Sequence, residues 1–309
     1  MSAHRRLALA TLLVAFCVIV LGAYVRLSDA GLGCPDWPLC YGQAVPGDHL
    51  GGDARGRAWK EMAHRYLAGA LGLLIVALLV SAWRRRQGIA LAAALVLLVV
   101  FQATLGMWTV TLLLRPAIVA AHLLGGMTTL ALLLWLFLSL GSHAASPEMR
   151  GLRLPAAAAL ATVAVQIALG GWVSANYAAL ACPDLPLCLG AALPPMDFHH
   201  AFHVFRELGQ TAAGERLPAQ ALTAIHWTHR VFALGVVAAV GWACLKAFFL
   251  MRPLAIGIAL LIALQFSLGV ANVAFGLPLP LAAAHNAGAA LLLASLVVLN
   301  FFSFRGLRP

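Results

Sequence analysis

Eight long runs of apolar residues constrain this chain more than any other feature of its sequence. Each run is close to the ~20 residues that an α-helix needs to cross the hydrocarbon core of a bilayer. A spanning segment has to satisfy its own backbone hydrogen bonds, and these runs lack the alternation of a β-barrel. The sequence therefore predicts an all-α polytopic membrane protein with eight transmembrane helices. The predicted spans are residues 7–25, 62–83, 89–111, 117–140, 155–175, 221–245, 254–275 and 281–303.

The composition agrees with a chain that lies mostly in lipid. Hydrophobic residues make up 63% of the sequence and charged residues only 10%, against roughly 25% charged residues in an ordinary soluble domain. The first run begins with basic residues, as a signal peptide does, but it is long and poorly suited to cleavage. We interpret it as the first transmembrane helix.

The net charge of +10 follows from the predicted topology. With the N-terminus inside, the inner segments carry one acid, Glu148, and the outer segments carry equal numbers of acids and bases. This asymmetry follows the positive-inside rule, so it predicts two cytoplasmic termini and needs no nucleic-acid partner. The inner basic residues are Arg5, Arg6, Arg84, Arg85, Arg86, Arg150, Arg153, Lys246, Arg252, Arg305 and Arg308.

The sequence contains an internal repeat. Residues 21–40 match residues 169–188 at a constant offset of 148. The repeat continues in the same order through two histidine-containing motifs and, between them, through residues 102–106, which match residues 265–269. The halves, residues 1–145 and 150–309, each contain four predicted helices. Because four is an even number, both halves have the same orientation, which predicts two four-helix bundles related by a pseudo-two-fold axis along the membrane normal.

Four histidines occupy equivalent places in the repeat: His64 and His122 in the first half, and His229 and His285 in the second. We expect them about four to eight residues inside the outer ends of their helices, at one depth. Two imidazoles that face each other in a bundle are typical axial ligands of haem iron. Two alternatives stay open, a hydrogen-bonded core histidine and a zinc or non-haem iron site formed with Glu61.

Charged residues accompany the first histidine of each half. Glu61 precedes His64 by three residues, on the same helix face, and its counterpart in the second half is His226. A carboxylate at this place is a candidate acid or base, or else a solvated glutamate at a helix start. Arg65 and Arg230 directly follow the histidines and are candidates to pair with a haem propionate, unless they only extend to the membrane surface.

Four of the six cysteines form two C-x5-C pairs in predicted outer loops: Cys34 with Cys40, and Cys182 with Cys188. Disulfides persist in the bacterial periplasm, and the intervening Pro-Asp-x-Pro-Leu sequence favours a compact turn. A structural bond and a redox-active bond both remain open. The other two cysteines lie within predicted helices and are interpreted as inert.

In these motifs, and in their order along all eight predicted helices, the chain resembles the haem A synthase family, membrane enzymes that convert haem O to haem A for cytochrome oxidases. The resemblance rests on residues 31–40, 61–65, 121–122, 226–230 and 284–286. One departure is a histidine-rich stretch, His199 to His203, for which we expect a surface loop or an incidental interfacial segment.

The resemblance implies a division of labour between the halves. Haem b is then a cofactor between His229 and His285, near His226 and Arg230. Haem O is the substrate near His64, His122 and Arg65, and Glu61 is the catalytic carboxylate. In such enzymes a ring methyl of haem O is oxidised to a formyl group through hydroxylation steps, and the b haem carries electrons away. The pair Cys34–Cys40 resembles the family pair that is implicated in redox or haem handling, whereas the pair Cys182–Cys188 varies in the family.

The resemblance also places the chain in the cell inner membrane, in contact with lipid, with the cysteine loops on the periplasmic side. Partners would be a haem O synthase, an electron acceptor and a second copy of the chain in a homo-oligomer. Two other functions fit the same motifs: a di-haem membrane cytochrome b for electron transfer, and a membrane protein that handles disulfides or haem.

Overall fold

A computed structural model describes residues 1–47 and 50–307 of the chain. Within these residues, eight helices are long and apolar enough to cross a membrane, and the only strand-like pairings are isolated bridges. The predicted all-α membrane fold is confirmed. Arg308, which the charge argument used, lies outside the described residues. The spanning helices are α1 (Ala3–Leu27), α2 (Gly52–Arg85), α3 (Ile89–Thr111), α4 (Pro116–Ser139), α5 (Arg153–Ala175), α7 (Ala219–Ala247), α8 (Arg252–Ala274) and α9 (Leu279–Arg305).

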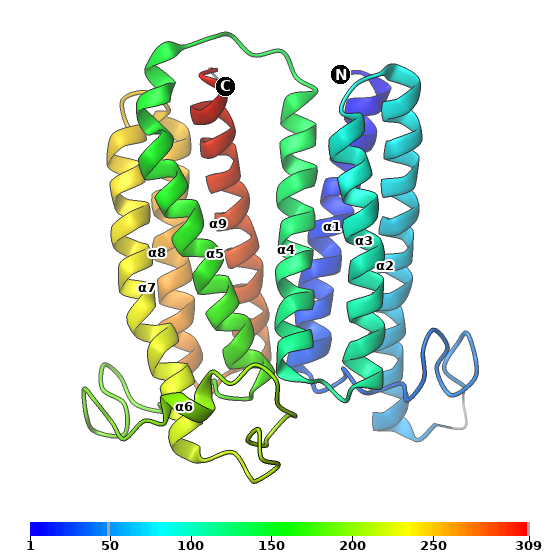
Figure 1. The fold of residues 1–309 in the computed structure, drawn as a ribbon, viewed down its shortest axis with the longest axis vertical. Helices are drawn as coiled ribbons and strands as arrows, with labels where there is room; N and C mark the ends of the chain where they lie inside the picture. Colours follow the sequence, from blue (N-terminus) through cyan, green and yellow to red (C-terminus); the bar gives the residue numbers. More distant parts are fainter. Residues whose placement is uncertain (48–49, 308–309) are drawn as a thin grey trace.

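The helices form two bundles side by side (Figure 1). Helices α1 to α4 pack in a ring of neighbours, and α5, α7, α8 and α9 pack in the same cyclic order. Contacts of α9 with α1 and α4, and of α4 with α5, join the bundles. In the most apolar stretch of each helix, 61% of the residues of α9 are buried, compared with 11% of the residues of α8. The centre of the molecule is therefore built by α1, α4, α5 and α9, while α8 faces the surroundings.

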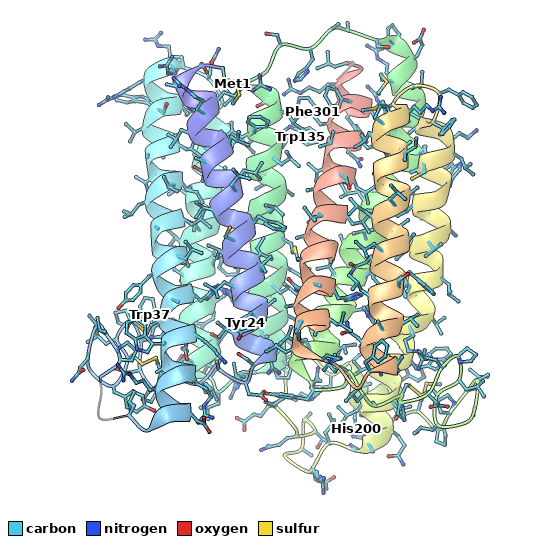
Figure 2. The ribbon with its side chains drawn as sticks, turned by 180° about the vertical axis from the view of Figure 1, so that it is seen from behind. Met1, Tyr24, Trp37, Trp135, His200 and Phe301 are labelled. Carbon is cyan, nitrogen blue, oxygen red and sulfur yellow. A yellow bond between two sulfur atoms is a disulfide. The ribbon has the colours of Figure 1, made fainter. Side chains whose placement is uncertain are left out.

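Both described termini lie at one end of the molecule, and both cysteine loops lie at the other (Figure 1). Figure 2 places Met1 at the end opposite Trp37 and His200. This arrangement is what a duplicated unit of four helices requires, because each half returns the chain to the side from which it started. The short 3-10 helix η1 (Pro147–Leu152) leads from the linker between the halves into α5.

Helix α2 begins at Gly52, ten residues before the predicted span. Its outer turns are too polar to be recognised as a span, but they are held by the first cysteine loop. A Cβ atom on Gly33 would come within 2.6 Å of the Arg57 backbone, so only glycine allows this close approach. As a result, His64 lies twelve residues from the start of α2, and His229 lies ten from the start of α7 (Ala219), so the expected four to eight residues are wrong for these two histidines.

The histidine-rich stretch lies at the surface, with Phe198 and His199 exposed, and it is also packed against the helices. It contains the short helix α6 (Phe198–Ala201), and the Ala201 carbonyl accepts a hydrogen bond from Trp172 Nε1 of α5 at 2.9 Å. Farther along, Glu207 forms an ion pair at 2.9 Å with Arg115, the residue that precedes α4. The segment therefore contacts both halves. It follows the second cysteine loop and precedes α7, where the first half has only a short connection.

We predict the orientation of this fold from its charges, and reporter fusions test it. Alkaline phosphatase inserted after Gly190, beside the second cysteine loop, should be active because that loop is expected to be periplasmic. The same enzyme inserted after Gly88, in the turn between α2 and α3, should be inactive. The reverse pattern would contradict the predicted topology.

Candidate functional site

A cavity of about 1790 Å³ is lined by all four repeated histidines. His64 comes from α2 and His122 from α4, and their ring centroids lie 6.5 Å apart with the ring planes at 82°. His229 on α7 and His285 on α9 line the same cavity from the second bundle. The structure thus places each pair on alternate helices of one bundle, as the repeat predicted. The cavity exceeds the roughly 300–1,000 Å³ of an ordinary ligand pocket.

Each of these histidine rings lies against a glycine on the preceding spanning helix. A Cβ atom added to that glycine would approach the ring Cε1 atom to between 2.7 and 3.4 Å. A Cβ atom on Gly22 would collide with the imidazole, one on Gly170 or Gly269 would crowd it, and one on Gly106 would make an ordinary van der Waals contact. The four contacts are Gly22 with His64, Gly106 with His122, Gly170 with His229 and Gly269 with His285.

The imidazoles have nitrogen atoms available for a ligand. The Nδ1 atoms of His64, His122 and His285 are buried and have no hydrogen-bond partner among the described residues. Burying an unpaired polar atom is unfavourable, so these rings fit a site that a bound group completes. Paired neutral imidazoles in an apolar cavity are suited to the iron of a planar macrocycle, which supports the expected fit of haem to this cavity.

The second bundle holds its histidine backbones more firmly than the first. Gln166 Nε2 donates to the His229 carbonyl at 3.0 Å, and Gln265 Nε2 donates to the His285 carbonyl at 2.9 Å. In the first bundle, the residue equivalent to Gln166 is Val18, which has no side-chain hydrogen-bond donor. Gln102, equivalent to Gln265, lies against Gly125 as Gln265 lies against Gly288, so the contrast between the bundles rests on Gln166 alone.

Glu61 is buried beside the first site. Only 5% of this residue is exposed, so the alternative of a solvated glutamate at a helix start is wrong. Its Oε2 accepts the backbone N–H of Cys34 at 2.9 Å, and its Oε1 accepts from Arg65 Nη2 at 2.5 Å. Glu61 also lines the cavity, together with His64. A carboxylate with two oxygens still has lone pairs free for a further donor.

His226 has the same contact in the second half. Its Nδ1 accepts the backbone N–H of Cys182 at 3.2 Å, and the residue is 4% exposed. Glu61 and His226 therefore share one structural task, which is to hold the first cysteine of each loop. Any difference in chemistry between Glu61 and His226 therefore has to come from contacts other than this shared hydrogen bond.

The two arginines bind the cysteine loops. Arg65 Nη1 donates to the carbonyls of Asp36 at 2.9 Å and Leu39 at 2.7 Å. Arg230 donates in the same way to the carbonyls of Asp184 at 3.0 Å and Leu187 at 3.0 Å. Both residues also line the cavity. A guanidinium has five N–H groups, so these contacts leave donors available for an anionic group.

An aspartate closes each loop from within. The amides of Leu189 and Gly190 donate to the two oxygens of Asp184 at 2.6 and 2.8 Å. The amide of Gly190, and to a smaller extent that of Leu189, hold the pKa of Asp184 below its ordinary value because they stabilise the charged form. Asp36 makes the same two contacts, with the amides of Tyr41 and Gly42.

Both predicted cysteine pairs are disulfides: Cys34 with Cys40, and Cys182 with Cys188. Cys17 and Cys244 are free thiols. The described residues contain no group of three or more His, Cys, Asp or Glu side chains arranged to hold a metal ion. The geometry therefore gives no support to a zinc site formed by Glu61, His64 and His122.

Residues 5–297 match the model of the COX15-CtaA family, described as cytochrome oxidase assembly protein. The chain belongs to this family. It is 41% identical to the heme A synthase of Shewanella oneidensis over 94% of each chain. It is also 30% identical to the heme A synthase of Alkalihalophilus pseudofirmus, over 65% of this chain and 71% of that one. The heme A synthase of Hyphomonas neptunium is 27% identical, over 91% and 88% of the two chains.

Sequence reasoning singled out the histidines but missed their neighbours. The motifs that revealed the repeat contain Gly22, Gly170, Gly106 and Gly269, yet only the packing of the helices shows that each glycine faces a ring. Gln166 gave no signal, because its counterpart Val18 is unrelated in chemistry.

Counting thiols will test the cysteine assignment. Under denaturing conditions we expect an alkylating reagent to label two cysteines, Cys17 and Cys244, before reduction. After reduction it should label all six, as measured by the mass of the intact protein. More than two labels before reduction would show that at least one loop disulfide is absent from the isolated protein.

Proposed function

We propose that this protein is an oxidoreductase that converts haem O to haem A. In this proposal haem O is bound near His64 and His122, and a haem b cofactor is held between His229 and His285. Membership of the family and relatives named heme A synthase support the proposal. The observation that carries it is the presence of two pairs of histidines in one cavity, with a carboxylate beside only one pair.

The hydrogen bond that Gln166 makes and Val18 cannot make supports the assignment of the two groups to the two bundles. A cofactor that stays bound benefits from ligands whose backbones are fixed, as Gln166 and Gln265 fix His229 and His285. A substrate has to enter and leave, and the first bundle, in which Val18 offers no side-chain donor to the backbone of His64, suits that task. We therefore assign residues 1–145 to substrate and residues 150–309 to cofactor.

The reaction oxidises a ring methyl group of haem O to a formyl group through hydroxylation steps. With water as the source of oxygen, the conversion of methyl to formyl releases four electrons and four protons. The b haem, when bound, supplies a one-electron carrier that passes these electrons toward an acceptor. The protein has to position the methyl group, exclude bulk water and accept protons.

Glu61 is the residue that we assign to proton transfer. It lines the cavity one helical turn from His64, and it is held in place by the Cys34 amide and by Arg65. A positioned carboxylate can take a proton from a reacting group in the transition state. His226, its counterpart, lies beside the cofactor site, where no proton transfer from substrate is required.

Arg65 and Arg230 are proposed to pair with haem propionates through the donors that the cysteine loops leave free. The loops would then position the arginines, and a disulfide in each loop would limit their movement. We further propose that the chain works in the inner membrane with these loops on the periplasmic side, with a haem O synthase and an electron acceptor as partners, and as a homo-oligomer.

Haem extraction tests the proposed function directly. Cells that make haem O should accumulate haem A when this chain is expressed, as measured by the pyridine haemochrome spectrum and the mass of extracted haems. A di-haem cytochrome b, or a protein that only handles haem or disulfides, would leave the porphyrins unchanged. Unchanged haem A would therefore refute the proposal.

Substitution of Glu61 should separate its chemical task from its structural one. The Glu61→His variant can still accept the Cys34 amide, as His226 does in the other half, but it lacks the carboxylate. We expect it to lose at least about 100-fold in haem A formation, within the range for general acid–base catalysis, while the b haem spectrum and both disulfides remain.

His226→Gln provides the matched control, because an amide oxygen can accept the Cys182 N–H and no substrate chemistry is assigned there. It should retain most of the haem A formation. Normal activity in Glu61→His would show that Glu61 only holds the loop.

Removing the glutamine contacts tests the assignment of the cofactor. Gln166→Val copies the residue of the first half and should increase the loss of b haem during dilution, because the His229 backbone is no longer held. Haem content per polypeptide, measured by absorbance after gel filtration, gives the result. An unchanged haem content in Gln166→Val and in the double variant with Gln265→Leu would contradict the assignment.

A further inference from the structure

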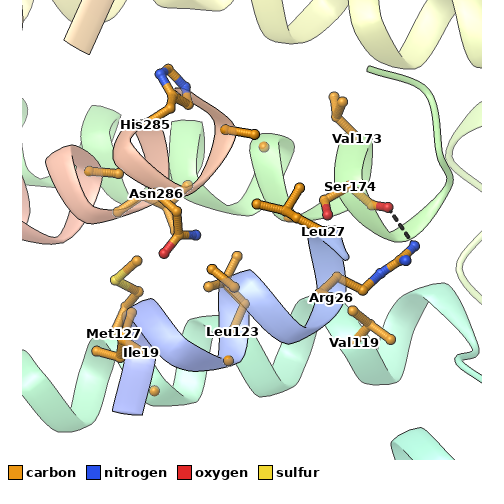
Figure 3. Close-up of a pocket in the computed structure, with 18 of the residues that line it drawn as sticks. Ile19, Arg26, Leu27, Val119, Leu123, Met127, Val173, Ser174, His285 and Asn286 are labelled. Atoms are coloured by element: carbon orange, nitrogen blue, oxygen red, sulfur yellow. Dashed lines mark hydrogen bonds between the residues drawn. The ribbon is translucent and has the colours of Figure 1, made fainter. Parts of the chain in front are cut away.

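The cavity continues from the histidine pairs into the interface between the two bundles. There it is lined by Ile19 of α1, Leu123 and Met127 of α4, and Asn286 and Ala289 of α9. Figure 3 shows Asn286 pointing across this space toward Leu123 and Met127. A planar macrocycle between His64 and His122 does not require this additional apolar space.

Asn286 is the polar exception in this part of the cavity. Its Oδ1 atom is buried and has no hydrogen-bond partner among the described residues. The repeat places Leu123 at the equivalent position of the first half, directly after His122, as Asn286 directly follows His285. The two halves therefore place a leucine and an amide against each other across the interface, and only the amide needs a hydrogen-bond partner.

The interface is closed at its outer end. Arg26 Nη2 donates to the Ser174 carbonyl at 2.8 Å (Figure 3). The Arg26 guanidinium also lies 4.0 Å from the centre of the Tyr177 ring. Toward the inner side, Met127 and Leu130 belong to a continuous buried core with Leu293 and Leu296. The space between these boundaries is suited to an apolar chain that carries a hydroxyl group.

We propose that the interface between the bundles binds the long side chain of the substrate haem, with Asn286 hydrogen-bonded to its hydroxyl group. This inference rests on the proposed function. Haem O carries an isoprenoid chain joined to the ring through a carbon that bears a hydroxyl, whereas haem B lacks this chain. A phospholipid acyl chain would fill apolar space equally well, but it has no hydroxyl to donate to the Asn286 oxygen. The interface thus selects the substrate by its tail.

Equilibrium titration of purified protein in lipid nanodiscs tests this proposal. The protein retains its b haem, and haem O or haem B is titrated while the absorbance of the first site is followed. Wild type should bind haem O more tightly than haem B. Asn286→Leu should reduce this preference by about tenfold, the effect of one hydrogen bond, with its b haem content unchanged.

Ala289→Trp is a second variant that fills the interface without touching the amide. It should weaken the binding of haem O and leave that of haem B unchanged. Leu291→Trp is the matched control, because Leu291 is 45% exposed on the same helix and does not line the cavity. It should bind both haems as wild type does.

The outcomes that overturn binding of the haem side chain in the interface differ from those that overturn the proposed conversion of haem O to haem A. An unchanged preference for haem O in both variants, or an equal loss of both haems, would show that the tail lies elsewhere. A phospholipid that copurifies with wild type and is lost from Ala289→Trp, with the haem preference unchanged, would assign the interface to lipid. If wild type binds no haem O at all, the proposed function itself fails.

Discussion

The close approach of a glycine to each of four imidazoles is the contact on which the rest of this structure depends. A histidine side chain is too large to lie between two tightly packed helices unless one of them has no side chain at that point. With Gly22, Gly106, Gly170 and Gly269 opposite the rings, the helices remain neighbours and the imidazoles still line a shared cavity. The cavity, and every function proposed for it, follows from this arrangement.

The cysteine loops stabilise the outer end of this arrangement. Each loop is closed by a disulfide, folded around an aspartate and bound by an arginine that follows a cavity histidine. The loop is also attached to the helix by a residue one turn before that histidine, Glu61 in one half and His226 in the other. Each loop is therefore bound directly to the helix turn that carries the first histidine of each pair.

Duplication has produced two sites with the same frame and different surroundings. The loops, glycines and histidines are shared, whereas Glu61 and His226, Val18 and Gln166, and Leu123 and Asn286 differ at equivalent places. Each difference changes the polarity beside the loops, glycines and histidines that the two halves share, and it leaves the helix packing unchanged. Such a protein can separate a reactive site from a cofactor site, because single side chains beside the shared loops, glycines and histidines can be exchanged one at a time.

The sequence by itself determined the number of spans, the repeat, the candidate histidines and the cysteine pairs, because hydrophobic length and repeated motifs are local properties of the chain. It did not determine where α2 begins, since the polar turns before residue 62 are held by packing against the preceding cysteine loop, which no hydrophobic pattern reveals. It also left open the burial of Glu61, the packing of the histidine-rich segment and the contacts of Gln166. These depend on which helices and loops become neighbours, and only tertiary packing decides that, because the partners are far apart in the sequence.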